Sequence, residues 1–250
     1  VVYLPRTEGI SSTMLREQSE EVYSIGVVGS GRIAKRFIPE SKFVNSANVT
    51  AVYDPNKDNA EDLCKRFGIK AFSDKFEDFL EEVDAVYVAS PHLTHYEYTK
   101  KALYAGKHVL CEIPFMLSAK NARELYDYAE THNLVLLEAS KTAFCPSFNH
   151  IVTLVKSGVI GDVVDVKTSL SKMVSSPTRE LDSEQAGGAM NEHAPLNMMA
   201  IVRLLGKDYE KVDFYSKKDN DVDVYTKVHI CYPHATASMT LGIGVKTEGN

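Results

Sequence analysis

A glycine-rich turn near the start of the chain has the residue types that bind phosphate. Residues 27–34 read VVGSGRIA and join an apolar run to a helix-like segment. A strand that passes through such a turn into a helix presents backbone N–H groups and the positive helix end to a pyrophosphate. We therefore expect this turn to contact a dinucleotide, through Gly29, Ser30, Gly31, Arg32 and Ile33.

An acidic residue follows the turn at the distance expected for ribose recognition. Asp54 ends an expected strand over residues 48–53, about twenty positions after the glycines. A carboxylate there accepts a hydrogen bond from the ribose 2′-hydroxyl and repels a 2′-phosphate. NAD is therefore the predicted cofactor and NADP the weaker expectation, although the neighbouring Asn56 and Lys57 soften this preference. A glycine turn used only for packing is the alternative.

The elements that must position these residues alternate between strand and helix. Strands are expected at 23–28, 48–53, 85–89, 108–111 and 134–138, with helical segments between them. This rhythm predicts an α/β fold, a doubly wound parallel Rossmann sheet. After residue 140 it changes to helices at 147–157 and 190–205 with strands at 163–171, 212–215, 222–231 and 236–244. We expect an α+β domain there, with a largely antiparallel open sheet.

These patterns predict three parts: a tail and linker at 1–21, a dinucleotide-binding domain at 22–140, and a substrate and oligomerisation domain at 141–250.

The net charge of −6 argues against nucleic-acid binding. The sequence has no apolar run of the ~18 residues that a membrane span needs. The four cysteines are far apart and lack zinc spacing, so we expect no metal site and a cytoplasmic location.

From about residue 22 the chain resembles the Gfo/Idh/MocA oxidoreductases. The ordered matches are VGSGRIA at 28–34, AVYDP at 51–55, ASPHLTH at 89–95, ALYAGKHVLCE at 102–112, LEA at 137–139, SGVIG at 157–161, GG at 187–188 and LLG at 204–206. The resemblance implies sugar or polyol substrates and homo-oligomers that form through the C-terminal sheet. It also implies that two loops lie beside the cofactor, with the residues Ser90, Pro91, His92, His95, Glu112 and Pro114.

The chain departs from the pattern of that family where the proton transfer is expected. The family's catalytic Lys and His positions are occupied here by Ile113 and Leu196, and neither side chain can donate a proton. The Asp position before that His is Glu192. Two substitutes are predicted: His193, one helical turn before Leu196, and Lys141, at a carboxyl strand end. A buried structural histidine and a solvated lysine are the alternatives.

The first sixteen residues resemble a different family. Residues 2–16 read VYLPRTEGISSTMLR, similar to the closing motif of glycerol-3-phosphate-type cytidylyltransferases, whose Arg and Ser/Thr-rich turn hold nucleotide phosphates. The sequence lacks the His-x-Gly-His half of that active site. We expect the chain to be part of a longer fusion protein, with chance similarity as the alternative.

Together the residues and the two resemblances imply an NAD(P)-dependent oxidoreductase that acts on a sugar, polyol or polyol phosphate, one that is also activated with CTP. Loss of both usual catalytic side chains keeps a second hypothesis open. In it, the chain is a catalytically degenerate dinucleotide-binding module that regulates or oligomerises a cytidylyltransferase.

Overall fold

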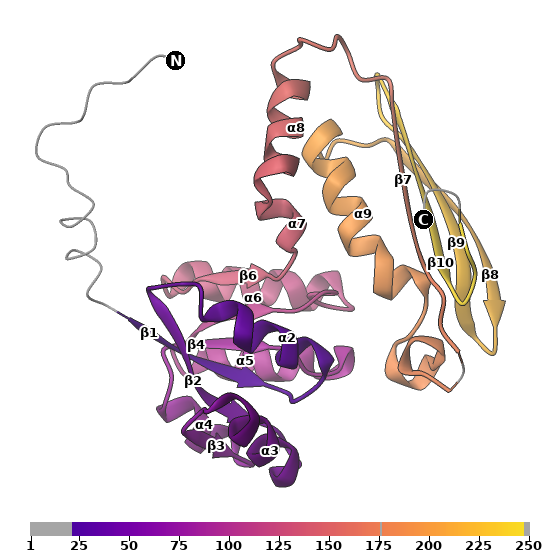
Figure 1. Cartoon of the computed structure of the whole chain (residues 1–250). Helices are drawn as coiled ribbons and strands as arrows, with labels where there is room; N and C mark the ends of the chain where they lie inside the picture. Colours follow the sequence, from indigo (N-terminus) through magenta and orange to yellow (C-terminus); the bar gives the residue numbers. More distant parts are fainter. Residues whose placement is uncertain (1–21, 176, 248–250) are drawn as a thin grey trace, which may run out of the picture. The chain divides into compact units, whose positions relative to one another are not determined.

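The computed structural model describes residues 22–175 and 177–247 (Figure 1). Its residues form two compact units. Among the described residues, the first holds residues 22–90 together with Glu97–Leu110 and Asp127–Leu136, and the second holds Pro91–Tyr96, Cys111–Tyr126 and residues 137–175 and 177–247. The predicted cytidylyltransferase tail at 1–21 lies outside the described residues.

A six-stranded sheet has the order β3-β2-β1-β4-β5-β6. Its strands are β1 (Tyr23–Val28), β2 (Ala47–Tyr53), β3 (Ala71–Ser73), β4 (Ala85–Val88), β5 (His108–Cys111) and β6 (Leu136–Glu138). β1 pairs in parallel with β2 and β4, and β2 pairs in parallel with β3. The chain thus builds outward from β1 in both directions, which confirms the predicted doubly wound sheet.

Crossover helices join these strands: α2 (Arg32–Ser41), α3 (Lys57–Phe67), α4 (Phe76–Glu81), α5 (His95–Tyr104) and α6 (Ala119–Thr131). Local sequence sets the ends of α3. The Asn56 side chain accepts hydrogen bonds from the first-turn N–H groups, and Gly68 ends the helix in the left-handed conformation, with φ of 71°. The turn that follows Asp54 is therefore fixed by a helix cap.

The second unit contains a four-stranded sheet of order β7-β10-β9-β8. Its strands are β7 (Asp165–Lys172), β8 (Lys211–Asp219), β9 (Val222–Cys231) and β10 (Thr236–Ile243). β9 pairs antiparallel with β8 and β10, whereas β7 and β10 are parallel. The sheet is mixed and mostly antiparallel, which confirms that part of the fold class.

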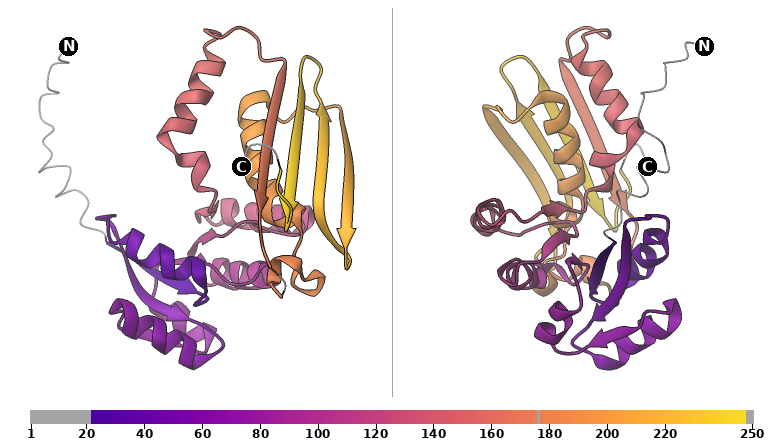
Figure 2. Two further views of the ribbon diagram at one scale, coloured as in Figure 1. Left: turned by 45° about the vertical axis from the view of Figure 1, so that its right-hand side comes forward. Right: turned by 90° about the vertical axis from the view of Figure 1, so that its left-hand side faces the viewer.

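After β6 the chain forms the helices α7 (Lys141–Phe144), α8 (Pro146–Lys156) and α9 (Ala189–Leu205), and two 3₁₀ turns, η2 (Arg179–Leu181) and η3 (Ser183–Gln185), precede α9. Figure 2 shows α9 against one face of the four-stranded sheet. Ile201 of α9 packs there with Ile230, Met239 and Leu241, all at most 1% exposed. This apolar layer holds α9 on the sheet, and the polar residues Glu192 and His193 lie near the start of the same helix.

Two features are absent from the described residues. No helix in them is both long enough and apolar enough to span a bilayer. They also contain no group of three or more His, Cys, Asp or Glu side chains suited to hold a metal ion.

Core side chains pack directly against Gly26 of β1, so a larger residue at this position should destabilise the fold. A β-carbon at Gly26 would lie 2.3 Å from Cζ of Phe79 and 2.9 Å from a methyl of Val83. Gly26→Ala should therefore lower the free energy of unfolding by about 1–3 kcal/mol, measured by urea denaturation. Gly31→Ala is the matched control, because a β-carbon there meets nothing within 4 Å. Equal stability of the two variants would contradict this packing.

Candidate functional site

The glycine turn after β1 is shaped by close contact with the end of β4. Gly29 has φ of +96°, and a β-carbon on it would lie 2.9 Å from the carbonyl oxygen of Ala89. Its N–H donates to the carbonyl of Tyr53 over 2.8 Å. Only glycine combines this positive φ with such an approach, so the turn is held between the ends of three neighbouring strands.

The start of α2 is open to an anion. Gly31 is the N-cap residue of α2, it is exposed, and no side chain caps the helix. A β-carbon on Gly31 would meet nothing within 4 Å, so there is open space in front of the turn. The first-turn N–H groups, including those of Arg32 and Ile33, are the donors that a helix start offers to phosphate. These residues fit the diphosphate of a dinucleotide.

Asp54, directly after β2, is joined to the same turn. Its Oδ2 accepts hydrogen bonds from the Ser30 backbone N–H at 3.0 Å and the Ser30 hydroxyl at 2.5 Å. Its Oδ1 accepts from the Asn56 N–H at 2.9 Å. The sequence predicted that Gly29, Ser30, Gly31 and Asp54 act together, and the structure brings them together in the first unit.

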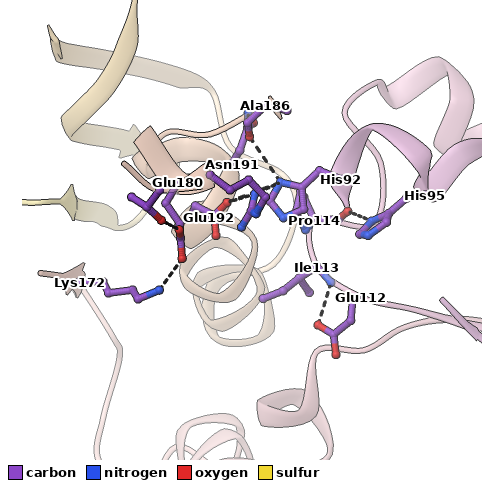
Figure 3. Close-up of polar contacts among 12 residues, drawn as sticks. His92, His95, Glu112, Ile113, Pro114, Lys172, Glu180, Ala186, Asn191 and Glu192 are labelled. Carbon is purple, nitrogen blue, oxygen red and sulfur yellow. Dashed lines mark hydrogen bonds and ion pairs between the residues drawn. The ribbon is translucent and has the colours of Figure 1, made fainter. Parts of the chain in front are cut away.

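In the second unit a charged cluster forms at the start of α9 (Figure 3). The Glu192 carboxylate pairs with the Arg179 guanidinium at 2.8 Å. Arg179 also lies 3.3 Å from Nδ1 of His92, and Glu192 lies 3.6 Å from that atom. Burial, followed by the Arg179 charge, lowers the pKa of His92 against the opposing effect of Glu192. The His92 ring is therefore neutral near pH 7.

The two loops that the family resemblance placed beside the cofactor contact one another within the second unit. His95 is 1% exposed, and its Nδ1 lies 2.9 Å from the carbonyl oxygen of Pro114. The Ile113–Pro114 peptide bond is cis, and the Ile113 N–H donates to the Glu112 carboxylate over 3.3 Å. Ile113 thus occupies an ordered loop position where its side chain has no group that ionises (Figure 3).

The two predicted proton-transfer residues differ in burial. His193 on α9 is 8% exposed, and its Nε2 has no hydrogen-bond partner among the residues that the structure describes. Burial lowers its pKa, while the neighbouring Glu192 opposes this. Lys141 is exposed at the first position of α7, directly after β6 as predicted. Both residues belong to the second unit.

A second ion pair lies beside the cluster and was not foreseen from the sequence. The Glu180 carboxylate accepts hydrogen bonds from the Lys172 ammonium at 2.5 Å and from the Thr178 hydroxyl. Burial would raise the pKa of Glu180, but these two donors outweigh it and lower the pKa to about 2. Arg179 and Glu180 lie in a loop without apolar periodicity, so the sequence carried no signal for either residue.

Comparison with known proteins agrees with this geometry. Residues 23–140 match the Gfo/Idh/MocA family model described as "Oxidoreductase family, NAD-binding Rossmann fold". This part of the chain is similar to the Gfo/Idh/MocA oxidoreductases. The chain is 30% identical over 148 residues to a glucose-6-phosphate 3-dehydrogenase of Bacillus subtilis, and 36% identical over 127 residues to scyllo-inositol 2-dehydrogenase (NADP(+)) IolU of the same species. The matches cover 59% and 50% of this chain.

Solved structures extend the likeness beyond residues 23–140. One such structure is KijD10, a 3-ketoreductase from Actinomadura kijaniata, solved with NADP and TDP-benzene. The match covers 90% of this chain and 71% of the KijD10 chain, with a TM-score of 0.80 and 27% sequence identity. The matches cover only 42% and 39% of the two Bacillus relatives. The chain therefore spans less than half of either curated relative.

The Glu180 ion pair generates a second prediction. The pKa of Glu180 in the folded state is about 2, below the ordinary value of 4.5. The ionised carboxylate therefore stabilises the fold fully above pH 4.5, and this stabilisation is lost as the pH falls toward 2. Glu180→Gln should lower the free energy of unfolding at pH 7 by about 1 kcal/mol, a modest value because Lys172 is half exposed. The difference should vanish near pH 2, while the exposed Glu184→Gln control should show none. A Glu180→Gln deficit that persists unchanged to pH 2 would contradict the ion pair.

Proposed function

We propose that the protein is an NAD-dependent oxidoreductase that transfers hydride between the nicotinamide and a hydroxyl-bearing carbon of a sugar, polyol or polyol phosphate. The observation that carries this proposal is the open glycine turn at the start of α2, tied to Asp54, in a domain similar to an oxidoreductase family. The names of the Bacillus relatives, a sugar-phosphate dehydrogenase and an inositol dehydrogenase, support the substrate class.

Asp54 supports NAD as the cofactor. The carboxylate can accept from a ribose hydroxyl, and its charge opposes a 2′-phosphate. The inositol dehydrogenase relative is named for NADP(+), and KijD10 was solved with NADP, so cofactor choice differs within this group of proteins. The preference proposed here therefore rests on Asp54 of this chain alone.

His193 is our candidate for the proton transfer. A bound nicotinamide accepts or supplies the hydride, so a side chain must take or return the hydroxyl proton. The buried, unpartnered Nε2 of His193 can accept a proton, because burial keeps the imidazole neutral near pH 7. The Glu192 charge then stabilises the imidazolium that forms. Lys141 is the second candidate and would donate a hydrogen bond to the reacting oxygen.

A second function is favoured by Ile113 and Leu196, which cannot transfer protons. In this proposal the chain binds a dinucleotide without turnover and regulates or oligomerises a cytidylyltransferase, whose closing motif residues 2–16 resemble. Both proposals require that the chain binds a dinucleotide. They differ in whether reduced nicotinamide is ever formed or consumed.

We also propose that the protein forms homo-oligomers through the four-stranded sheet and works in the cytoplasm. Phe214 and Tyr215 on the edge strand β8 are 73% and 68% exposed, and such an edge favours pairing with another strand. Its four cysteines are free thiols, as expected in a reducing compartment.

The enzyme proposal predicts a pH effect at His193. Alcohol oxidation requires the neutral imidazole, so kcat/KM should rise with pH through a His193 pKa that lies below the ordinary value of 6.5, and should level off above that pKa. His193→Ala should reduce kcat at least about 100-fold and remove this rise of kcat/KM with pH, measured from nicotinamide absorbance with polyols and sugar phosphates. Lys141→Met tests the second candidate in the same assay.

His234→Ala, an exposed histidine of the same unit, is the control and should retain activity. Full activity of His193→Ala with an unchanged pH profile would overturn the role of His193. Tight NADH binding without turnover on any substrate would favour the regulatory module.

A further inference from the structure

We propose that the Ser30 hydroxyl positions the Asp54 carboxylate and thereby sets the discrimination between NAD and NADP. This inference rests on the proposed function only in that it requires dinucleotide binding. Ser30 is a positioning residue in this proposal, because it acts through Asp54 rather than on the reacting atoms.

Only one of the hydrogen-bond donors to Asp54 depends on the type of residue that supplies it. Three donors reach the carboxylate: the Ser30 N–H at 3.0 Å, the Ser30 hydroxyl at 2.5 Å, and the Asn56 N–H at 2.9 Å. Two of them are backbone groups that almost any residue supplies. The hydroxyl is a side-chain donor, and its contact with Asp54 is half-buried, short and charge-assisted. The identity of residue 30 therefore decides how firmly Oδ2 is held.

The other side of the carboxylate is fixed by the start of α3. Oδ1 of Asn56 accepts from the N–H groups of Asp58 at 3.0 Å and Asn59 at 3.4 Å. This cap orients the backbone of Asn56, whose N–H holds Oδ1 of Asp54. Asp54 is thus held between the glycine turn and a capped helix, and the Ser30 hydroxyl completes that attachment.

This attachment has a consequence for the ribose. A carboxylate has about four acceptor positions, and three of those on Asp54 are filled, which leaves one on Oδ1 for a ribose hydroxyl. A 2′-phosphate offers no donor when fully ionised and meets a charge that cannot turn away. Without the Ser30 hydroxyl, Oδ2 loses one of its two donors and the carboxylate can rotate. Rotation weakens the preorganised contact with NAD and relieves the repulsion of NADP.

The test is calorimetric titration of NADH and NADPH into the wild-type chain and matched variants. Ser30→Ala should raise the Kd for NADH about three- to tenfold and lower the Kd for NADPH by about twofold, so that the ratio of the two constants moves toward one. Ser30→Thr keeps a hydroxyl and should restore the wild-type ratio. Ser157→Ala, at the end of α8, is the control for a lost serine hydroxyl.

A double-mutant cycle tests whether Ser30 acts through Asp54. In an Asp54→Asn background, Ser30→Ala should change the ratio by less than twofold, because the charge to be positioned is gone. A wild-type ratio in Ser30→Ala, or an equal effect in both backgrounds, would overturn the role of Ser30 while leaving the proposed function intact. A wild-type chain that binds neither dinucleotide would overturn the inference and the proposed function together.

Discussion

The close approach of the β1 and β4 strand ends is the constraint on which the functional geometry depends. The carbonyl oxygen of Ala89 would lie 2.9 Å from any β-carbon at Gly29, and the positive φ of Gly29 turns the chain sharply toward α2. Because the turn is this tight, α2 begins a few residues after the carboxyl end of β1, and no side chain caps its first N–H groups. The turn follows the buried second half of β1, in which Val27 and Val28 are at most 1% exposed.

The second unit concentrates charge at the start of one apolar helix. The packing of α9 on the four-stranded sheet holds Glu192 beside Arg179 and keeps His193 buried. The side chains of Glu192 and Arg179 are 14% and 28% exposed, so this ion pair is held in one geometry more firmly than a pair on the surface. Glu192 forms an ion pair with Arg179, although its buried Oε1 makes no hydrogen bond there, and Nε2 of His193 also has no hydrogen-bond partner among the described residues. A buried unpaired polar atom is costly, so its retention is consistent with a functional role.

Much of the fold could be predicted from the sequence, because its strands and helices carry strong local signals. Strand β1 reads YSIGVV and ends in the apolar pair Val27 and Val28, and α3 has both an Asn cap and a Gly stop. The three-residue strand β3 and the four-residue helix α7 were missed, since elements this short have no periodicity to detect. The glycine turn and Asp54 were predicted from spacing alone. Arg179 and Glu180 could not be, because tertiary packing rather than local pattern brings their loop to α9.

The measurement that tests the central claim most directly is mapping of NADH binding by backbone-amide NMR shifts on the deuterated chain. The account predicts that the largest shifts belong to residues 29–34 and to Asp54, with saturation at one NADH per chain. Shifts that spare the glycine turn, or that appear only in the second unit, would contradict it.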